Sequence, residues 1–221
     1  MIKAIILDFD GVIVDSEPIH MLTFQELLGP LGVKIEKKRW YREFVGTGSR
    51  TIMKRLFDEF NIKEDADAYV ARRKQLFASY VEKGAVKPVN GIAEFLKIAR
   101  EKNLKLAIAS GSHKNSIVQL LKMFGLESFF DAVVGAEDTV RKKPDPEPFL
   151  TAAKKLNIPP SDCLVVEDGL PGMKAAEAAG MSVVMMRSAA SSHLNNDVVI
   201  INDFSEFPFK VTDESVTTVR K

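Results

Sequence analysis

The chain of 221 residues contains a single cysteine, Cys163, and no long uninterrupted hydrophobic run. One cysteine excludes an internal disulfide and a cysteine-rich zinc site, and a small buried thiol is the simplest interpretation. The chain also lacks an excess of either charge, because 31 basic and 30 acidic residues leave a formal charge of +1. No strong electrostatic field therefore indicates nucleic acid or an anionic membrane as a partner.

The first apolar segment, residues 2–7, is interrupted by Asp8 and Asp10, so it is neither a signal peptide nor a membrane span. The composition is ordinary for a soluble globular protein, with 46% hydrophobic and 28% charged residues. The length allows one substantial core and a smaller inserted unit, and is short for two full-sized domains. We expect a cytoplasmic enzyme or binding protein.

Several familiar motifs are missing. The chain has no G-x-x-x-x-G-K-[ST] phosphate loop, and the segment 46–51 lacks the third glycine of a dinucleotide fingerprint. The segment Asp8–Gly11 resembles the start of a calcium loop but lacks an acid at the fifth position and a usable glutamate at the twelfth. Metal-ligand spacing is absent from the histidines, which are His20, His113 and His193.

Short apolar runs alternate with segments of helical spacing. Apolar positions at i, i+3, i+4 and i+7 predict helices, for example over 92–99 and 117–124. This alternation predicts an α/β fold with a parallel sheet that helices cover on both faces. The predicted strands are 2–7, 104–109, 132–134, 164–166, 183–186 and 198–201.

Residues 16–87 break the alternation. Helical patterns fill this region, including apolar stripes that contain Phe24 and Met53, and no convincing strand occurs. Glycine and proline in the segment 83–91 suit a linker or hinge. We predict a helical unit over 16–87, inserted into a core of residues 1–15 and 88–210, and a polar tail over 211–221.

Polar residues follow four of the predicted strands. In open α/β sheets, ligands bind just beyond the carboxyl ends of the strands, so these residues are candidates for one site. Carboxylates, a hydroxyl and a lysine are the parts that phosphoryl transfer requires, together with a metal such as Mg²⁺, which prefers oxygen ligands. In the order of the chain, the residues are Asp8 and Asp10, Ser110 and Gly111, Lys143, and Glu167 and Asp168.

The acidic residues can be interpreted in more than one way. An extended backbone would point Asp8 and Asp10 to the same side, where they repel unless they share a cation or a proton. The alternative is a solvated turn, because Asp and Gly favour turns. Glu167 and Asp168 are adjacent, so only one can be a direct ligand unless the chain turns there. We favour Asp168, with Glu167 as an indirect or water-mediated partner.

The other polar residues suit an anion. Ser110 and Gly111 combine a hydroxyl, close access to the backbone and the start of a helix. The alternative is an ordinary helix N-cap by Ser110 or Ser112. Lys143 precedes Pro144, which favours an extended conformation at the lysine.

The segment Asp8–Glu17, Ser110, the pair Lys143–Pro144 and the segment Glu167–Gly169 resemble the four motifs of the haloacid dehalogenase superfamily. Within it, the chain is most similar to the β-phosphoglucomutase-like phosphatases, and the similarity covers residues 1–205. The resemblance implies a Rossmann-like core, an inserted all-helical cap and a Mg²⁺-dependent phosphatase.

The resemblance also implies roles by position. Asp8 would attack phosphorus and form an aspartyl-phosphate. Asp10 would protonate the leaving oxygen and then deprotonate the attacking water. Dehalogenases of the superfamily lack this second aspartate, so Asp10 favours phosphate chemistry. The implied metal ligands are Asp8, the backbone carbonyl of Asp10, and Asp168, with Glu167 nearby, and the implied phosphate-binding residues are Ser110, Gly111 and Lys143.

The inserted unit bears on the choice between phosphatase and phosphomutase. Val45 stands where the mutase pattern has lysine, and Arg50 falls one place past its arginine, whereas His20 is retained. We predict a monomeric phosphatase that acts on a small, sugar-phosphate-like ester and contacts it through His20 and Arg50. The alternatives are a phosphomutase of the β-phosphoglucomutase type and a non-catalytic phosphometabolite-binding module.

Overall fold

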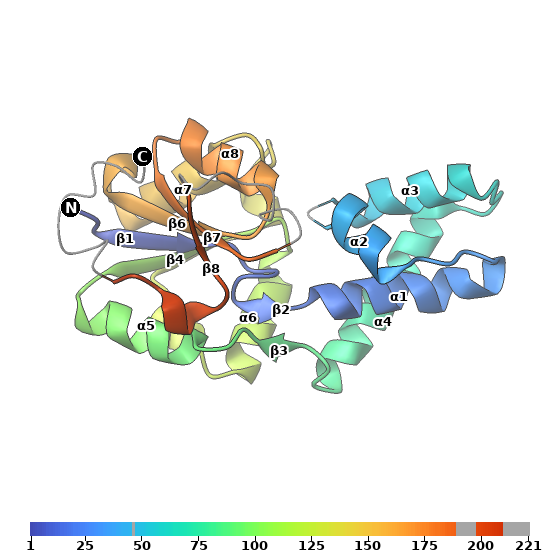
Figure 1. The fold of residues 1–221 in the computed structure, drawn as a ribbon, viewed down its shortest axis with the longest axis horizontal. Helices are drawn as coiled ribbons and strands as arrows, with labels where there is room; N and C mark the ends of the chain where they lie inside the picture. The colour runs from blue at the N-terminus through green and yellow to red at the C-terminus, as the bar shows by residue number, and fades with distance from the viewer. Residues whose placement is uncertain (46, 189–197, 210–221) are drawn as a thin grey trace. The chain divides into compact units, whose positions relative to one another are not determined.

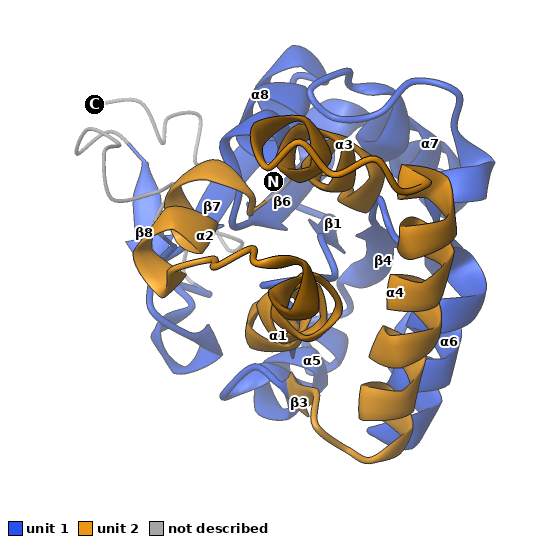
Figure 2. Cartoon of the chain, turned by 90° about the vertical axis from the view of Figure 1, so that its right-hand side faces the viewer, with its two compact units in different colours: residues 1–14, 88–221 blue, residues 15–87 orange. Residues whose placement is uncertain are grey.

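The computed structural model describes residues 1–45, 47–188 and 198–209. It divides into two compact units, which Figure 2 colours separately. The core unit comprises Met1–Val14 and Pro88–Lys221, and the helical unit comprises Asp15–Lys87. The tail predicted over 211–221 lies outside the described residues. Among the helices that are described, none combines the length and the apolar character that crossing a membrane requires.

The core unit is built on a six-stranded parallel sheet with the order β5-β4-β1-β6-β7-β8 (Figure 1). Every strand expected from the apolar runs is present, with small shifts at the ends, so the predicted α/β fold is confirmed. The strands are β1 Ala4–Leu7, β4 Lys105–Ala109, β5 Ala132–Val134, β6 Cys163–Glu167, β7 Ser182–Met186 and β8 Val199–Ile201.

Helices cover both faces of this sheet (Figure 1). The sheet lies between the pair α5 and α6 on one face and the pair α7 and α8 on the other. These helices are α5 Ile92–Glu101, α6 Lys114–Met123, α7 Glu147–Leu156 and α8 Leu170–Ala178.

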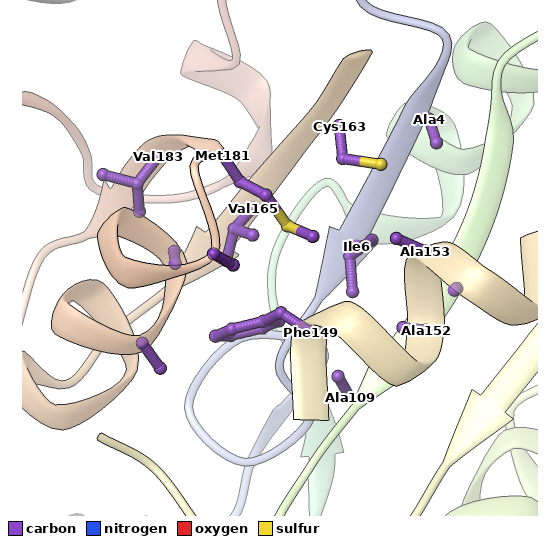
Figure 3. Packing of buried hydrophobic residues seen from close by; sticks show 14 of the residues in the cluster. Ala4, Ile6, Ala109, Phe149, Ala152, Ala153, Cys163, Val165, Met181 and Val183 are labelled. Carbon is purple, nitrogen blue, oxygen red and sulfur yellow. The ribbon is translucent and has the colours of Figure 1, made fainter. Parts of the chain in front are cut away.

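The core between the sheet and α7 follows from strand alternation. Ala4 and Ile6 of β1 point to the α7 side, where they join one cluster of buried residues. Phe149 of α7 is fully buried in the same cluster, and Figure 3 shows it close to Ile6 and Val165. Burial of a side chain of this size contributes about 2–3 kcal/mol to stability.

The order of the strands determines where a ligand can bind. After β1 the chain passes to β4 and β5 on one side of that strand, and it then returns to β6 on the other side. The connections from β1 and β6 therefore diverge, which makes the carboxyl ends of these two strands the switch point of the sheet. Leu7 pairs with Val166 across this central strand pair, so Asp8 and Glu167 follow at the same level.

The helical unit has its own aromatic core. Trp40 is buried with its ring 5.4 Å from the ring of Phe24 and 5.6 Å from that of Phe44. Met53, from one of the expected apolar stripes, is fully buried in α3, whereas Phe60 lies just past this helix and is 36% exposed. The helices are α1 Glu17–Leu28, α2 Lys37–Glu43, α3 Ser49–Glu59 and α4 Ala66–Glu82.

Two short strands mark the points where the chain passes between the units. These are β2 Val14–Asp15 and β3 Lys87–Pro88, which pair with each other in a two-stranded sheet. The pairing holds the outgoing and returning segments side by side.

Cys163 is buried in β6, as expected of a structural thiol. Burial, aided by the charge of Asp162, raises the pKa of this thiol to about 11. The thiol is therefore protonated and unreactive at neutral pH.

Asp131 joins β5 to β4 at the edge of the sheet. Its Oδ2 accepts hydrogen bonds from the Leu106 amide at 2.9 Å and from Arg100 Nη1 at 2.7 Å, and Lys105 Nζ lies 3.2 Å from Oδ1. Partial burial alone would raise the pKa of Asp131, but these bonds outweigh it and hold the pKa below its usual value.

We expect Asp131→Asn to lower the free energy of unfolding by about 1–2 kcal/mol at neutral pH, because the bonds to a charged acceptor are lost. The lowered pKa stabilises the fold above the unfolded pKa of about 4, and this contribution disappears as pH falls through the folded pKa. Urea unfolding of both proteins across this range tests the prediction. A stability difference that does not shrink in acid would count against it.

Candidate active site

Asp8 extends the sheet by one residue. Its amide donates to the Val166 carbonyl at 2.9 Å, which continues the hydrogen bonding of β1 to β6 past Leu7. The chain then turns at Gly11, where φ is +76° and the amide donates to the Val14 carbonyl. A Cβ at Gly11 would lie 2.3 Å from Asp168 Oδ2, so the turn needs glycine for its close approach to that carboxylate as well as for its backbone angle.

The end of β6 also turns at once. Glu167 Oε2 accepts hydrogen bonds from the amides of Asp168 and Gly169, each at 2.7 Å. The chain is therefore not extended here, and the two adjacent acids reach the same site. One oxygen each from Asp8, Glu167 and Asp168 lies within 4.8 Å of the others.

Lys143 lies between two of these carboxylates. Its Nζ is 2.9 Å from Asp8 Oδ1 and 2.6 Å from Glu167 Oε1. The side chains of Lys143, Asp8 and Glu167 are only 15%, 13% and 3% exposed, so little water screens these interactions. Burial alone would lower the pKa of Lys143, but attraction to the two carboxylates raises it above its usual value. The ammonium therefore stays charged.

Burial raises the pKa of Asp8 to about 7; Lys143 opposes this rise, and the charges of Glu167 and Asp10 add to it. Asp8 Oδ1 is buried and accepts no regular hydrogen bond within the described ranges, although it forms the ion pair with Lys143. The ionised form of a buried carboxylate such as Asp8 is stabilised when a further positive charge lies beside it.

The donor set fits a hard divalent cation. All the candidate ligand atoms in the cluster of Asp8, Glu167 and Asp168 are oxygens, as Mg²⁺ and Ca²⁺ prefer. Both oxygens of Glu167 already accept hydrogen bonds, Oε1 from Lys143 and Oε2 from two amides. These bonds make Glu167 less suited to direct metal contact.

The segment after β4 is held by its own hydrogen bonds. The Ser110 amide donates to the Val134 carbonyl at 3.0 Å, and Ser110 Oγ accepts from the Ser112 amide at 3.0 Å. Helix α6 begins at Lys114 with His113 as its N-cap, and the first amide of the helix donates to the Glu137 carboxylate at 3.1 Å. The alternative interpretation of Ser110 or Ser112 as an N-cap is therefore wrong. Gly111 is exposed, which leaves its amide accessible to an anion.

Two serines contact the predicted residues in ways that the sequence did not reveal. Ser112 Oγ donates to Asp10 Oδ2 at 2.6 Å, and Ser188 Oγ donates to the Asp168 carbonyl at 2.6 Å. Ser112 lies only two residues after a predicted site residue, which is a weak signal. Nothing in the local sequence marks Ser188, which follows β7.

The predicted substrate contacts His20 and Arg50 belong to the helical unit. His20 Nδ1 is 3.1 Å from Arg73 Nη1, and the His20 ring stacks on Phe77 at 4.3 Å. Arg50 forms an exposed ion pair with Asp67 at 2.5 Å. Their contact with a substrate stays a prediction. Residue 46, which precedes Arg50 in the same part of the chain, lies outside the described residues.

Gly172 provides space for the Glu167 carboxylate. A Cβ at this position in α8 would lie 1.7 Å from Glu167 Oε1, the oxygen that accepts from Lys143. Glycine is otherwise unfavourable within a helix, so its presence here reflects the close approach of the carboxylate.

Comparison with known proteins identifies the family of the chain. The family model described as haloacid dehalogenase-like hydrolase matches residues 5–186, and the chain belongs to this family. The fructose-1-phosphate phosphatase YqaB of Escherichia coli is 31% identical over 83% of this chain and 95% of its own length. The phosphorylated carbohydrates phosphatase of Thermotoga maritima is 28% identical over 81% of this chain and 82% of its own.

A solved structure has the same fold. The β-phosphoglucomutase of Clostridium difficile matches with a TM-score of 0.80 and 24% identity, and the match covers 95% of each chain. The resemblance inferred from the four motifs is confirmed, including the Rossmann-like core and the inserted helical unit.

We expect Gly172→Ala to lower the free energy of unfolding by at least about 2 kcal/mol, because the new methyl group displaces the Glu167 carboxylate from Lys143. Gly29→Ala is the matched control, since a Cβ there meets nothing within 4 Å and the residue has φ −54°. Denaturant unfolding compares the two. Equal stability of both variants would show that Glu167 moves aside without cost.

Proposed function

We propose that this chain is a Mg²⁺-dependent phosphatase that hydrolyses a small, sugar-phosphate-like metabolite through an aspartyl-phosphate on Asp8. The observation that carries the proposal is the cluster of Asp8, Glu167 and Asp168 at the switch point, with Lys143 paired to two of its members. A nucleophile, an acidic metal site and a fixed cation beside one another suit phosphoryl transfer.

The chain is a phosphoric monoester hydrolase of the haloacid dehalogenase type, as its family and its phosphatase relatives indicate. Two of these relatives carry names that specify phosphorylated carbohydrates or fructose 1-phosphate. They favour a phosphorylated carbohydrate as the substrate. We further propose that the protein acts as a cytoplasmic monomer.

Mg²⁺ would be held by the carboxylates of Asp8 and Asp168 and by the backbone carbonyl of Asp10. Glu167 would support it indirectly, because it anchors Lys143 and the turn that carries Asp168. When bound, the ion supplies positive charge that offsets the negative charge of the phosphoryl oxygens.

In the first step, a carboxylate oxygen of Asp8 attacks phosphorus and the bond to the leaving oxygen breaks. Asp10 donates its proton to that oxygen, which leaves as an alcohol. Lys143 balances charge on the transferring phosphoryl group, and the Ser110 hydroxyl and the Gly111 amide donate to its oxygens.

In the second step, Asp10 is a carboxylate and takes a proton from water as the water attacks phosphorus. The bond between phosphorus and Asp8 breaks, which releases inorganic phosphate and restores the Asp8 carboxylate. Asp10 regains its proton in this step, so the cycle closes without another proton donor.

A phosphomutase is the alternative. His20 is retained from the mutase pattern, but Val45 replaces its lysine and Arg50 pairs with Asp67. Incubation with a panel of phosphorylated sugars and Mg²⁺, with both free phosphate and isomerised product measured, separates the two activities. Isomer without free phosphate would favour the mutase.

Asp8→Asn is expected to abolish hydrolysis of aryl phosphates, because the amide is a poor nucleophile. Release of 4-nitrophenol measures activity, and trapping with radiolabelled substrate detects the phosphoryl-enzyme in the wild type. Turnover like that of the wild type would contradict the nucleophile assignment. Loss of turnover with retained binding of a sugar phosphate would exclude a purely structural effect of the substitution.

Asp10→Asn is expected to lower kcat/KM by about 10²–10⁴ for an alkyl phosphate, as for the loss of a general acid. The loss should be much smaller for 4-nitrophenyl phosphate, whose leaving group needs no proton. The ratio of the two losses is the measurement, since kcat/KM reports the first phosphoryl transfer. Similar losses for both substrates would argue against proton donation by Asp10.

A further inference from the structure

We infer that Ser112 is a positioning residue whose hydroxyl holds the Asp10 carboxylate in the orientation that delivers a proton to the leaving oxygen. The inference rests on the proposed phosphatase function and adds to it a residue outside the predicted set. Its basis is the hydrogen bond of 2.6 Å from Ser112 Oγ to Asp10 Oδ2, between residues that are 102 positions apart in the chain.

The Ser112 backbone is anchored from both sides. Its amide donates to Ser110 Oγ at 3.0 Å, and its carbonyl accepts from the Ala136 amide at 2.9 Å. Ser110 is in turn bonded to the Val134 carbonyl of β5. The main chain that carries the Ser112 hydroxyl is therefore fixed to the ends of β4 and β5.

The backbone around Asp10 is equally well held. The amides of Ile13 and Val14 both donate to the Phe9 carbonyl, and the Gly11 amide donates to the Val14 carbonyl. These bonds fix the main chain of the turn but leave the Asp10 side chain two rotatable bonds. The bond from Ser112 joins this side chain to a second fixed segment.

The contact is a short hydrogen bond between a hydroxyl and a carboxyl group. The Ser112 hydroxyl donates and Asp10 Oδ2 accepts at 2.6 Å, and this oxygen can accept both in the carboxylate and in the acid that carries its proton on the other oxygen. A general acid must be held within hydrogen-bond reach of the atom it protonates, so the orientation of this carboxylate affects the rate directly.

The Ser112 hydroxyl has no role at the start of α6. The N-cap of that helix is His113, and the side chain that accepts from its first amide is Glu137 rather than Ser112. Ser112 is half-buried, so removal of its hydroxyl opens no large cavity. The choice of serine at this position is therefore explained by Asp10 rather than by the stability of the loop.

The test measures kcat/KM of Ser112→Ala with phosphate monoesters whose leaving groups range from 4-nitrophenol through phenol to glycerol. We expect a loss of about tenfold with glycerol phosphate, the size typical of one lost hydrogen bond, and little change with 4-nitrophenyl phosphate. Ser112→Thr keeps a hydroxyl and should restore activity. Ser116→Ala, also half-buried, in α6, is the matched control and should equal the wild type.

A double substitution separates positioning from other roles. Asp10→Asn with Ser112→Ala should be no slower than Asp10→Asn alone, because Ser112 acts through Asp10. An equal loss of kcat/KM for all leaving groups, or additive losses in the double variant, would overturn the inference. A Ser112→Ala variant whose kcat/KM equals that of the wild type for every ester would also overturn it. A wild type that hydrolyses none of the esters with Mg²⁺ would instead refute the proposed function itself.

Discussion

The ion pairs of Lys143 with Asp8 and Glu167 are the interaction on which the site depends. Lys143 lies 2.9 Å from Asp8 and 2.6 Å from Glu167, and these acids end two neighbouring strands. Without this ammonium, two poorly solvated carboxylates would face each other at the switch point of the sheet, at a large cost in free energy. Under the proposed function, the same ammonium that offsets these two carboxylates would balance the charge of a phosphoryl group.

Much of the fold was predictable because its elements are local in origin. Each strand of the core sheet is a short apolar run, and helices such as α5 have apolar positions at regular helical spacing. The location of the site followed from the same pattern, because polar residues directly after buried strands of a parallel sheet must lie at one edge. Asp8 and Asp168 were predicted in this way, whereas Lys143 lies well past the end of β5 and was predicted from its place before Pro144.

The remaining parts of the site depend on contacts between distant segments. Ser112 reaches Asp10 only once β4 lies beside β1, and Gly172 is required only because the Glu167 carboxylate folds back against α8. The turn after β6 also depends on side-chain contacts, because the Glu167 carboxylate accepts hydrogen bonds from the next two backbone amides. Sequence spacing carries little trace of such contacts, so the N-cap interpretation of the serines was wrong.

The pairing of β1 with β6 has a consequence for synthesis of the protein. Ala4 pairs with Cys163, so β1 cannot pair with β6 until the ribosome has synthesised a segment far along the chain. A partly made chain already carries Asp8 but lacks Glu167 and Asp168, so the acidic cluster of these three residues cannot form. Under the proposed function, turnover would therefore require β6 to be in place beside β1.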